Sequence, residues 1–161
     1  MSGEVGSGSP AQRRAELYAP FRPRLARTVT LAMAVVVLVL TVALMVALPH
    51  LVPVYGVPDL IGIAILGALI SGFCWRQATV SARVDPAGIT VRNLLVRRRL
   101  EWAEVVSVRF GNGRPWVQLD LSDGDTLAVM GIQRADGVRS EQEASRLATL
   151  VALHSQTPRD D

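Results

Sequence analysis

A run of 21 residues without a charged side chain constrains this chain more than any other feature. Residues 28–48 read TVTLAMAVVVLVLTVALMVAL. At about 1.5 Å per residue, a helix of this length crosses the roughly 30 Å hydrocarbon core of a bilayer. A cleaved signal peptide is the alternative, but its apolar region would be only about 7–15 residues long. We therefore predict a transmembrane helix over residues 28–48.

A second apolar run follows a proline-rich turn. Residues 49–59, PHLVPVYGVPD, contain three prolines and a glycine, which favour a turn. Residues 57–75 then form a shorter apolar run that ends at Trp75, a residue suited to the membrane interface. For so short a run, the buried helix of a soluble protein is the alternative. Together the two runs predict a two-helix transmembrane hairpin over residues 28–76.

Arginine placement predicts the orientation of this hairpin. All 17 basic residues are Arg; five of them lie within residues 13–27, the loop at 49–59 has none, and Arg76 and Arg83 follow the second run. Positively charged flanks stay in the cytoplasm, so we expect a multi-pass protein of the cell membrane with both termini cytoplasmic. Residues 1–27 are predicted to form a disordered basic tail, and residues 155–161 a polar tail.

The second run carries small residues four positions apart. Ala64, Ala68 and Gly72 share one helical face, and Gly67 and Ser71 lie beside them. Small residues let helix backbones approach closely in lipid. We favour packing of the stripe against the first helix, for example at Ala43 and Ala47, over the alternative that it is the contact face of a homodimer.

Residues 79–154 have the alternation of β-strands. Short apolar-polar repeats are separated by turn signals such as DPAG at 85–88, GNG at 111–113 and SDGD at 122–125. The alternation gives roughly six strands, with Val106, Val108 and Phe110 on one face of the fourth. Ser140 and Glu143 then match a capping box, and an apolar stripe at helical spacing follows at Ala144, Leu147, Leu150 and Val151.

Two segments of this region resemble a known family. DPAGITVRN at 85–93 and RRLEWAEV at 98–105 are similar to the bacterial PH-like domain of low-molecular-weight protein antigen 6 proteins, which are typically actinobacterial. The resemblance covers about residues 24–153. It implies a bent antiparallel sheet or barrel with a C-terminal amphipathic helix, preceded by two membrane helices. It implies no enzyme activity and no known ligand.

The sequence offers no set of residues with catalytic or metal-binding spacing. His50 and His154 lie in different predicted regions, and Cys74 has no histidine near it. Asp120, Asp123 and Asp125 flank a turn, where Asp is common for conformational reasons, and they are too few for a calcium loop. We therefore predict a non-enzymatic protein without a cofactor or a metal.

Two features remain as candidate contact sites. Arg97, Arg98 and Arg99 follow three apolar residues and could touch anionic lipid headgroups, although a solvated basic hairpin is the favoured explanation. Trp116 lies on the polar face of its predicted strand and is the candidate partner contact. Trp102, which shares a face with Leu100, is predicted to be a core residue.

These observations favour a membrane-anchored module for protein interaction at the cytoplasmic face of the membrane. The alternatives are a sensor of anionic lipid surfaces, or an accessory subunit of a membrane enzyme or transporter. The expected partners are the lipid bilayer, an unidentified protein and possible further copies of the chain. A net charge of +3 is too small to indicate nucleic-acid binding.

Overall fold

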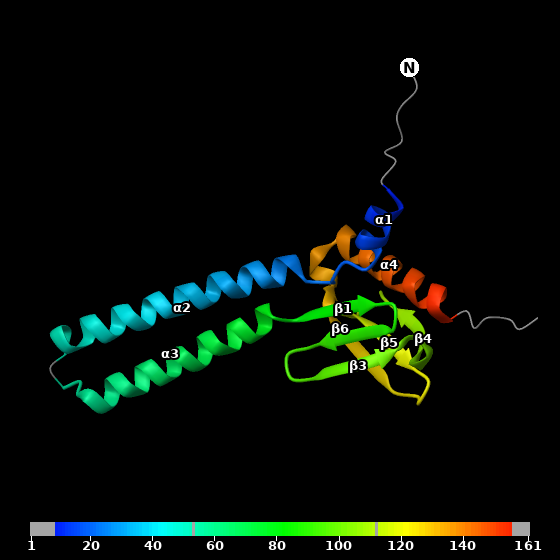
Figure 1. Ribbon diagram of the computed structural model, residues 1–161. Coiled ribbons are helices and arrows are strands. Elements are labelled where there is room, and N and C mark those ends of the chain that lie inside the picture. The colour runs from blue at the N-terminus through cyan, green and yellow to red at the C-terminus, as the bar shows by residue number, and fades with distance from the viewer. Residues whose placement is uncertain (1–8, 53, 112, 156–161) are drawn as a thin grey trace, which may run out of the picture. The chain divides into compact units, whose positions relative to one another are not determined.

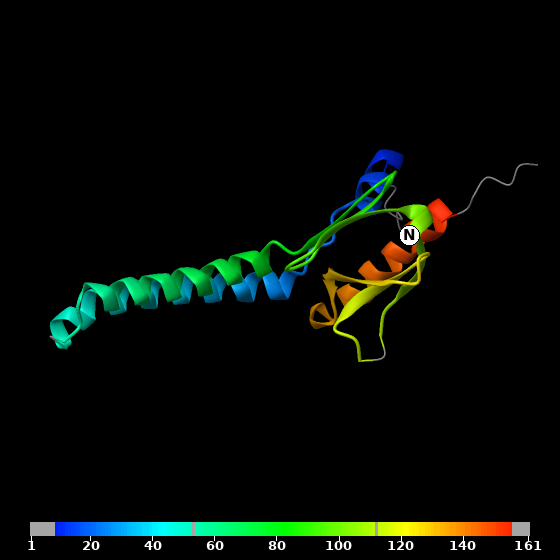
Figure 2. The same ribbon diagram turned by 90° about the horizontal axis from the view of Figure 1, so that it is seen from below.

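The computed structural model describes residues 9–52, 54–111 and 113–155. The chain folds into two compact units. One unit is Arg24–Val80; the other combines the N-terminal segment up to Pro23 with the residues from Ser81 onward. Figures 1 and 2 show the elements of both units. The predicted polar tail at 155–161 lies outside the described residues, apart from Ser155.

The first unit is a pair of long helices, α2 (Arg24–Leu51) and α3 (Val57–Ala78). They run side by side in both views (Figures 1 and 2). Both helices are long and apolar enough to cross a membrane. They extend beyond the predicted 28–48 and 57–75, because Pro23 directly before α2 suits a helix start and Pro49 is accommodated in the last turn.

The contact between these helices is centred on Gly67. A Cβ atom at Gly67 would lie 2.2 Å from Oγ1 of Thr41, so only glycine fits at this position. Ala68 and Gly72 are exposed, and nothing lies within 4 Å of a Cβ built at Gly72. The face toward α2 therefore contains only part of the predicted small-residue stripe, and Gly67 meets Thr41 rather than the alanines suggested by the sequence.

The second unit contains two antiparallel three-stranded sheets. Their strands are β1 (Ser81–Asp85), β2 (Gly88–Arg92) and β3 (Arg97–Glu101), and β4 (Val105–Arg109), β5 (Trp116–Leu121) and β6 (Thr126–Gln133). Each sheet has its strands in sequence order, and the two sheets do not close into a barrel. Short helical turns at Trp102–Glu104 and Arg134–Asp136 precede β4 and helix α4 (Val138–Ser155).

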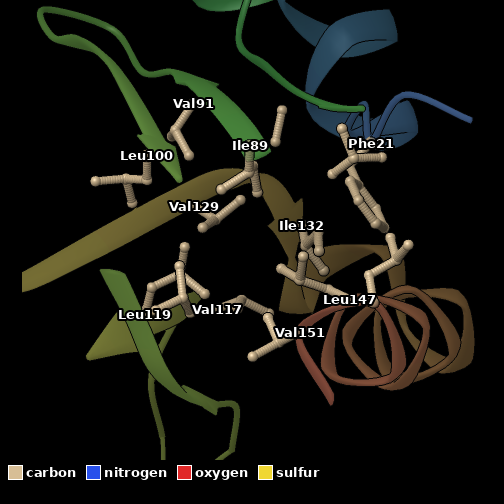
Figure 3. Packing of buried hydrophobic residues seen from close by; sticks show 14 of the residues in the cluster. Phe21, Ile89, Val91, Leu100, Val117, Leu119, Val129, Ile132, Leu147 and Val151 are labelled. Carbon is tan, nitrogen blue, oxygen red and sulfur yellow. The ribbon is translucent and has the colours of Figure 1, made fainter. Parts of the chain in front are cut away.

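The core lies between these sheets and α4. It includes the inward residues of the strands and the α4 stripe that the sequence predicted: Ile89, Val91, Leu100, Val117, Leu119, Val129, Ile132, Ala144, Leu147, Leu150 and Val151. Figure 3 shows this packing. The predicted mainly β domain with a C-terminal amphipathic helix is therefore confirmed.

The N-terminal segment differs from the predicted disordered tail where the structure describes it; residues 1–8 lie outside the described residues. Helix α1 (Pro10–Leu17) has Ser9 as its N-cap residue, and the Ser9 amide donates to the Gln12 side chain at 2.9 Å. Phe21 is only 1% exposed, and its backbone pairs with Ala82 of β1 at 2.8 and 2.9 Å. Figure 3 shows its side chain in the core on the side of Ile132 and Leu147.

One side chain of α4 holds this segment in place. The guanidinium of Arg146 lies 3.9 Å from the centroid of the Phe21 ring and donates to the carbonyls of Glu16, Leu17 and Ala19 at 2.7–3.1 Å. The Glu16 carbonyl also accepts from the Ala19 amide at 3.2 Å, so the guanidinium adds to the hydrogen bonding where α1 ends. The basic composition of the segment concealed this anchoring, because the acceptors are backbone atoms that any sequence supplies.

The start of α4 is also earlier than the capping-box pattern predicted. Gly137 has a φ of 61°, which lets the chain turn sharply into the helix at Val138. Ser140 is therefore inside the first turn, is 2% exposed, and donates its hydroxyl to the Gly137 carbonyl at 2.6 Å. The prediction that Ser140 caps the helix was wrong, and Glu143 instead pairs with Arg139 at 3.2 Å.

Candidate functional site

The three consecutive arginines do not form one basic patch. In β3, as in any strand, successive side chains point to opposite faces, so Arg98 lies on the face opposite to Arg97 and Arg99. Arg98 reaches Asp123 at 3.2 Å and Asp125 at 3.8 Å, and Arg99 reaches Asp85 at 3.0 Å. Two of the three charges are thus paired with carboxylates.

These pairs act locally on the turns that they join. The backbone amide of Asp125 and the guanidinium of Arg98 lower the pKa of Asp123 below its ordinary value of 3.8, against the opposing effect of burial. Both side chains remain substantially exposed, and water screens such pairs so strongly that they add little to stability. Arg98 therefore fixes the 122–125 turn to β3, a structural role that leaves little of its charge for a lipid surface.

The two tryptophans of this unit have different surroundings. Trp102 is 4% exposed, donates its indole N–H to the Asp85 carbonyl at 3.0 Å, and stacks on the His154 ring at 5.0 Å between centroids. Its prediction as a core residue is confirmed. Trp116 is half-buried at the start of β5, opposite Gln133 of β6. Its role as a partner contact stays a prediction.

Strand β4 presents a free edge beside the strand that carries Trp116. Among the described strands, β4 pairs only with β5 and is an edge strand. The register shifts between Val105 and Ser107, which buries Val105 and leaves Val106 66% exposed. The expected common face of Val106, Val108 and Phe110 was therefore wrong at Val106, because a bulge reverses the alternation.

A cleft opens where β4 ends and α4 begins. Its described lining residues are Phe110, Gly111, Gly113, Arg134, Gly137, Val138, Ser140 and Glu141. Val138 is 71% exposed, and Phe110 is only partly buried against the core. The amide of Arg134, one of these lining residues, donates to the Pro115 carbonyl at 2.9 Å. Trp116 is the residue directly after Pro115. The described lining thus combines the apolar side chains of Phe110 and Val138 with one cation and one carboxylate.

Outside these surfaces, the described histidines and the cysteine, which are potentially reactive, lie in structural positions. His154 bonds through Nδ1 to the Leu150 carbonyl at 2.9 Å and through Nε2 to the Tyr18 hydroxyl at 3.0 Å. Among the described residues, no three His, Cys, Asp or Glu side chains are grouped so as to hold a metal. Cys74 is buried in α3, and His50 lies in the last turn of α2.

Asp120, the first of the three turn aspartates, is engaged by three side chains. It accepts hydrogen bonds from Ser107 at 2.5 Å and Thr126 at 3.4 Å, and it forms an ion pair with Arg109. The Ser107 hydroxyl and the Arg109 guanidinium lower the pKa of Asp120 below its ordinary value of 3.8. This carboxylate therefore connects β4, β5 and β6.

Comparisons with known proteins agree with this architecture. Residues 79–149 match the model of a family described as "Bacterial PH domain". Three uncharacterized mycobacterial proteins, one from Mycobacterium bovis and two from strains of Mycobacterium tuberculosis, are each 34% identical to the chain over 101 residues. The match covers 63% of this chain and 66% of each relative, just under two thirds of their length. No solved structure matches the chain.

Proposed function

We propose that the protein is a membrane-anchored, non-catalytic module for protein interaction, because residues 79–149 match the model of a bacterial PH domain and follow two apolar helices. The helices hold the domain at the cytoplasmic face of the cell membrane, with both termini in the cytoplasm. PH domains are in general non-catalytic, which agrees with the structural uses of His154 and Asp120.

The helical unit supports the anchoring. At about 1.5 Å per residue, the 28 residues of α2 and the 22 residues of α3 both exceed the roughly 30 Å of a bilayer core. The most apolar windows of the two helices are 0% and 11% buried within the protein. Such apolar side chains are unfavourable in water and favourable in lipid, and the arginine distribution supports the proposed orientation.

The observation that carries the interaction role is the free β4 edge beside the cleft. An extended peptide can add to a sheet edge through main-chain hydrogen bonds and place alternate side chains in neighbouring pockets. Here Phe110 and Val138 would contact an apolar side chain, while Arg134 and Glu141 would select polar neighbours. The partner expected from this chemistry is an extended segment with an apolar side chain flanked by charges.

Site-directed photocrosslinking in native membranes tests the proposal. A photoreactive residue replaces Val106 in the full chain, and a matched control carries it at Ala87, an exposed residue of the β1–β2 turn. We expect a discrete adduct from position 106 only. A second substitution, Val138→Arg, should remove that adduct without unfolding the domain, because surface substitutions usually change stability by less than about 0.5 kcal/mol.

Adducts of equal yield from both positions, or an adduct that survives Val138→Arg, would refute a peptide site at this edge. The identity of the adduct decides the remaining alternatives. A product of twice the mass of the chain identifies a second copy as the partner. A membrane enzyme or transporter in the adduct identifies the chain as its accessory subunit.

A further inference from the structure

Three arginines gather on the outer face of the β1–β2–β3 sheet. The register places Ser81 opposite Arg92 and Arg92 opposite Arg97, and it places Arg83 opposite Thr90 in the next row. All five residues line one shallow depression. The other face of the same strands is packed in the core through residues such as Ile89 and Val91, so this outer face is held rigidly from behind.

This arrangement is electrostatically unfavourable by itself. Arg92 and Arg97 are directly opposed across β2 and β3, and like charges in that position destabilise a sheet. Arg83, Arg92 and Arg97 are exposed, and within the described part of the chain none of them forms an ion pair. The two carboxylates on this face, Asp85 and Glu101, lie at the other end of the strands, where Asp85 pairs with Arg99. Three cationic groups therefore converge without a counter-charge.

We propose that Arg83, Arg92 and Arg97, together with the hydroxyls of Ser81 and Thr90, form a binding site for a phosphate group. Guanidinium groups bind phosphate through pairs of parallel N–H donors, and hydroxyls add single donors to the remaining oxygens. A carboxylate has two oxygens and one charge, which two arginines satisfy. Three arginines and two hydroxyls match the larger number of oxygens of a phosphate group, which has four in tetrahedral directions; in a diester headgroup two of them carry the single charge and two are esterified.

The neighbouring turn indicates the source of the phosphate. Leu95 and Val96, between Arg92 and Arg97, are 81% and 54% exposed. Apolar side chains beside basic ones are the arrangement that inserts at a membrane interface and attracts anionic headgroups. Ser81 also follows the last residue of α3 by only three residues, a reach of at most about 11 Å. The site accordingly takes the headgroup phosphate of an anionic phospholipid.

The phosphate chemistry of this site is independent of the proposed peptide site, whereas its lipid source rests on the proposed membrane anchoring. Of the three arginines that the sequence suggested for lipid contact, only Arg97 belongs to it. Arg83 and Arg92 are 14 and 5 positions earlier in the chain. They join Arg97 because antiparallel pairing places residues that are distant in the sequence in the same row.

The test uses the full chain in neutral detergent micelles, with the arginine Nε–Hε NMR signals as the readout. Inorganic phosphate is added at constant ionic strength and compared with chloride. A second arm compares nanodiscs of phosphatidylcholine with nanodiscs that also contain phosphatidylglycerol. We expect saturable shifts of the Arg83, Arg92 and Arg97 signals with phosphate in micelles, and the same shifts with phosphatidylglycerol in nanodiscs.

Variants make the test specific. Each single Arg→Gln substitution should weaken phosphate binding roughly fivefold, which corresponds to about 1 kcal/mol per basic residue near an anionic group. The triple variant R83Q/R92Q/R97Q should lose the saturable response. The control R13Q/R14Q/R22Q removes the same net charge from exposed positions of the N-terminal segment and should retain the response.

The outcomes separate the site from its source. Shifts with inorganic phosphate but none with phosphatidylglycerol keep the phosphate site and overturn the lipid source. Shifts with phosphatidylglycerol alone support the lipid source and a site that requires the headgroup. Equal responses to phosphate and chloride, or equal responses of the two triple variants, would show simple charge screening and overturn the proposal.

Discussion

Replacing Phe21 with Ala tests whether the N-terminal segment belongs to the folded domain. The Phe21 side chain is 1% exposed in the core and lies under the Arg146 guanidinium at 3.9 Å. Truncating a fully buried Phe to Ala costs about 3–5 kcal/mol, from lost apolar burial and from the cavity that remains. A disordered tail residue would cost nothing. The two interpretations therefore differ by several kcal/mol.

The assay is thermal unfolding of the full chain in neutral detergent, followed by tryptophan fluorescence, to which the buried Trp102 contributes together with Trp75 and Trp116. At about 4–8 °C per kcal/mol for a domain of 60–100 residues, Phe21→Ala should lower the Tm by at least about 12 °C. The matched control is Phe73→Ala in α3, where the ring is 54% exposed. We expect little change in this transition for the control. A Phe21→Ala variant that melts within about 2 °C of the wild type would refute the anchoring.

Three further predictions concern the core, the helix contact and pH. Trp102→Ala should cost about 3–5 kcal/mol in urea unfolding, whereas Trp116→Ala, at a half-buried position, should cost about 1 kcal/mol. Gly67→Ala should weaken the α2–α3 pair by about 1–3 kcal/mol in a denaturing-detergent titration followed by circular dichroism, whereas Gly72→Ala should be tolerated because its Cβ meets no atom within 4 Å. Because the pKa of Asp120 is lowered in the folded domain, its carboxylate stabilises the domain at pH values above the ordinary pKa of 3.8. This contribution is lost as the pH falls through the folded-state pKa. Tm measurements between about pH 5 and pH 2 should therefore show a smaller acid-induced decrease for Asp120→Asn than for the wild type.

Local sequence signals determined much of this protein. The uncharged runs predicted the two long helices. A chain of this size cannot bury so many apolar helical side chains within itself. The alternation of Val117, Leu119 and Leu121 predicted a strand with one buried face, and all three are at most 4% exposed. The α4 stripe was equally readable, because helical spacing places such residues on one face whatever they pack against.

A local signal for α1 was also present in the sequence. Ser9 and Gln12 have the spacing of a capping box, and Pro10 suits the first helical position. The Gly- and Ser-rich start of the chain, together with Pro20 and Pro23, led instead to the prediction of a disordered tail. No local pattern, however, could have shown that Phe21 enters the core, because its partners Ala82 and Arg146 are 61 and 125 positions further along the chain.

Only the tertiary structure decided which charges are available for binding. Arg97, Arg98 and Arg99 look equivalent in the sequence, but the pleat of β3 and the position of the 122–125 turn give Arg98 and Arg99 carboxylate partners and leave Arg97 beside Arg92. The sequence of such a run shows which charges are present, but it does not show which oppositely charged groups will pair with them. Those depend on strand register and on which turns come together, and both are long-range properties that the chain acquires when it folds.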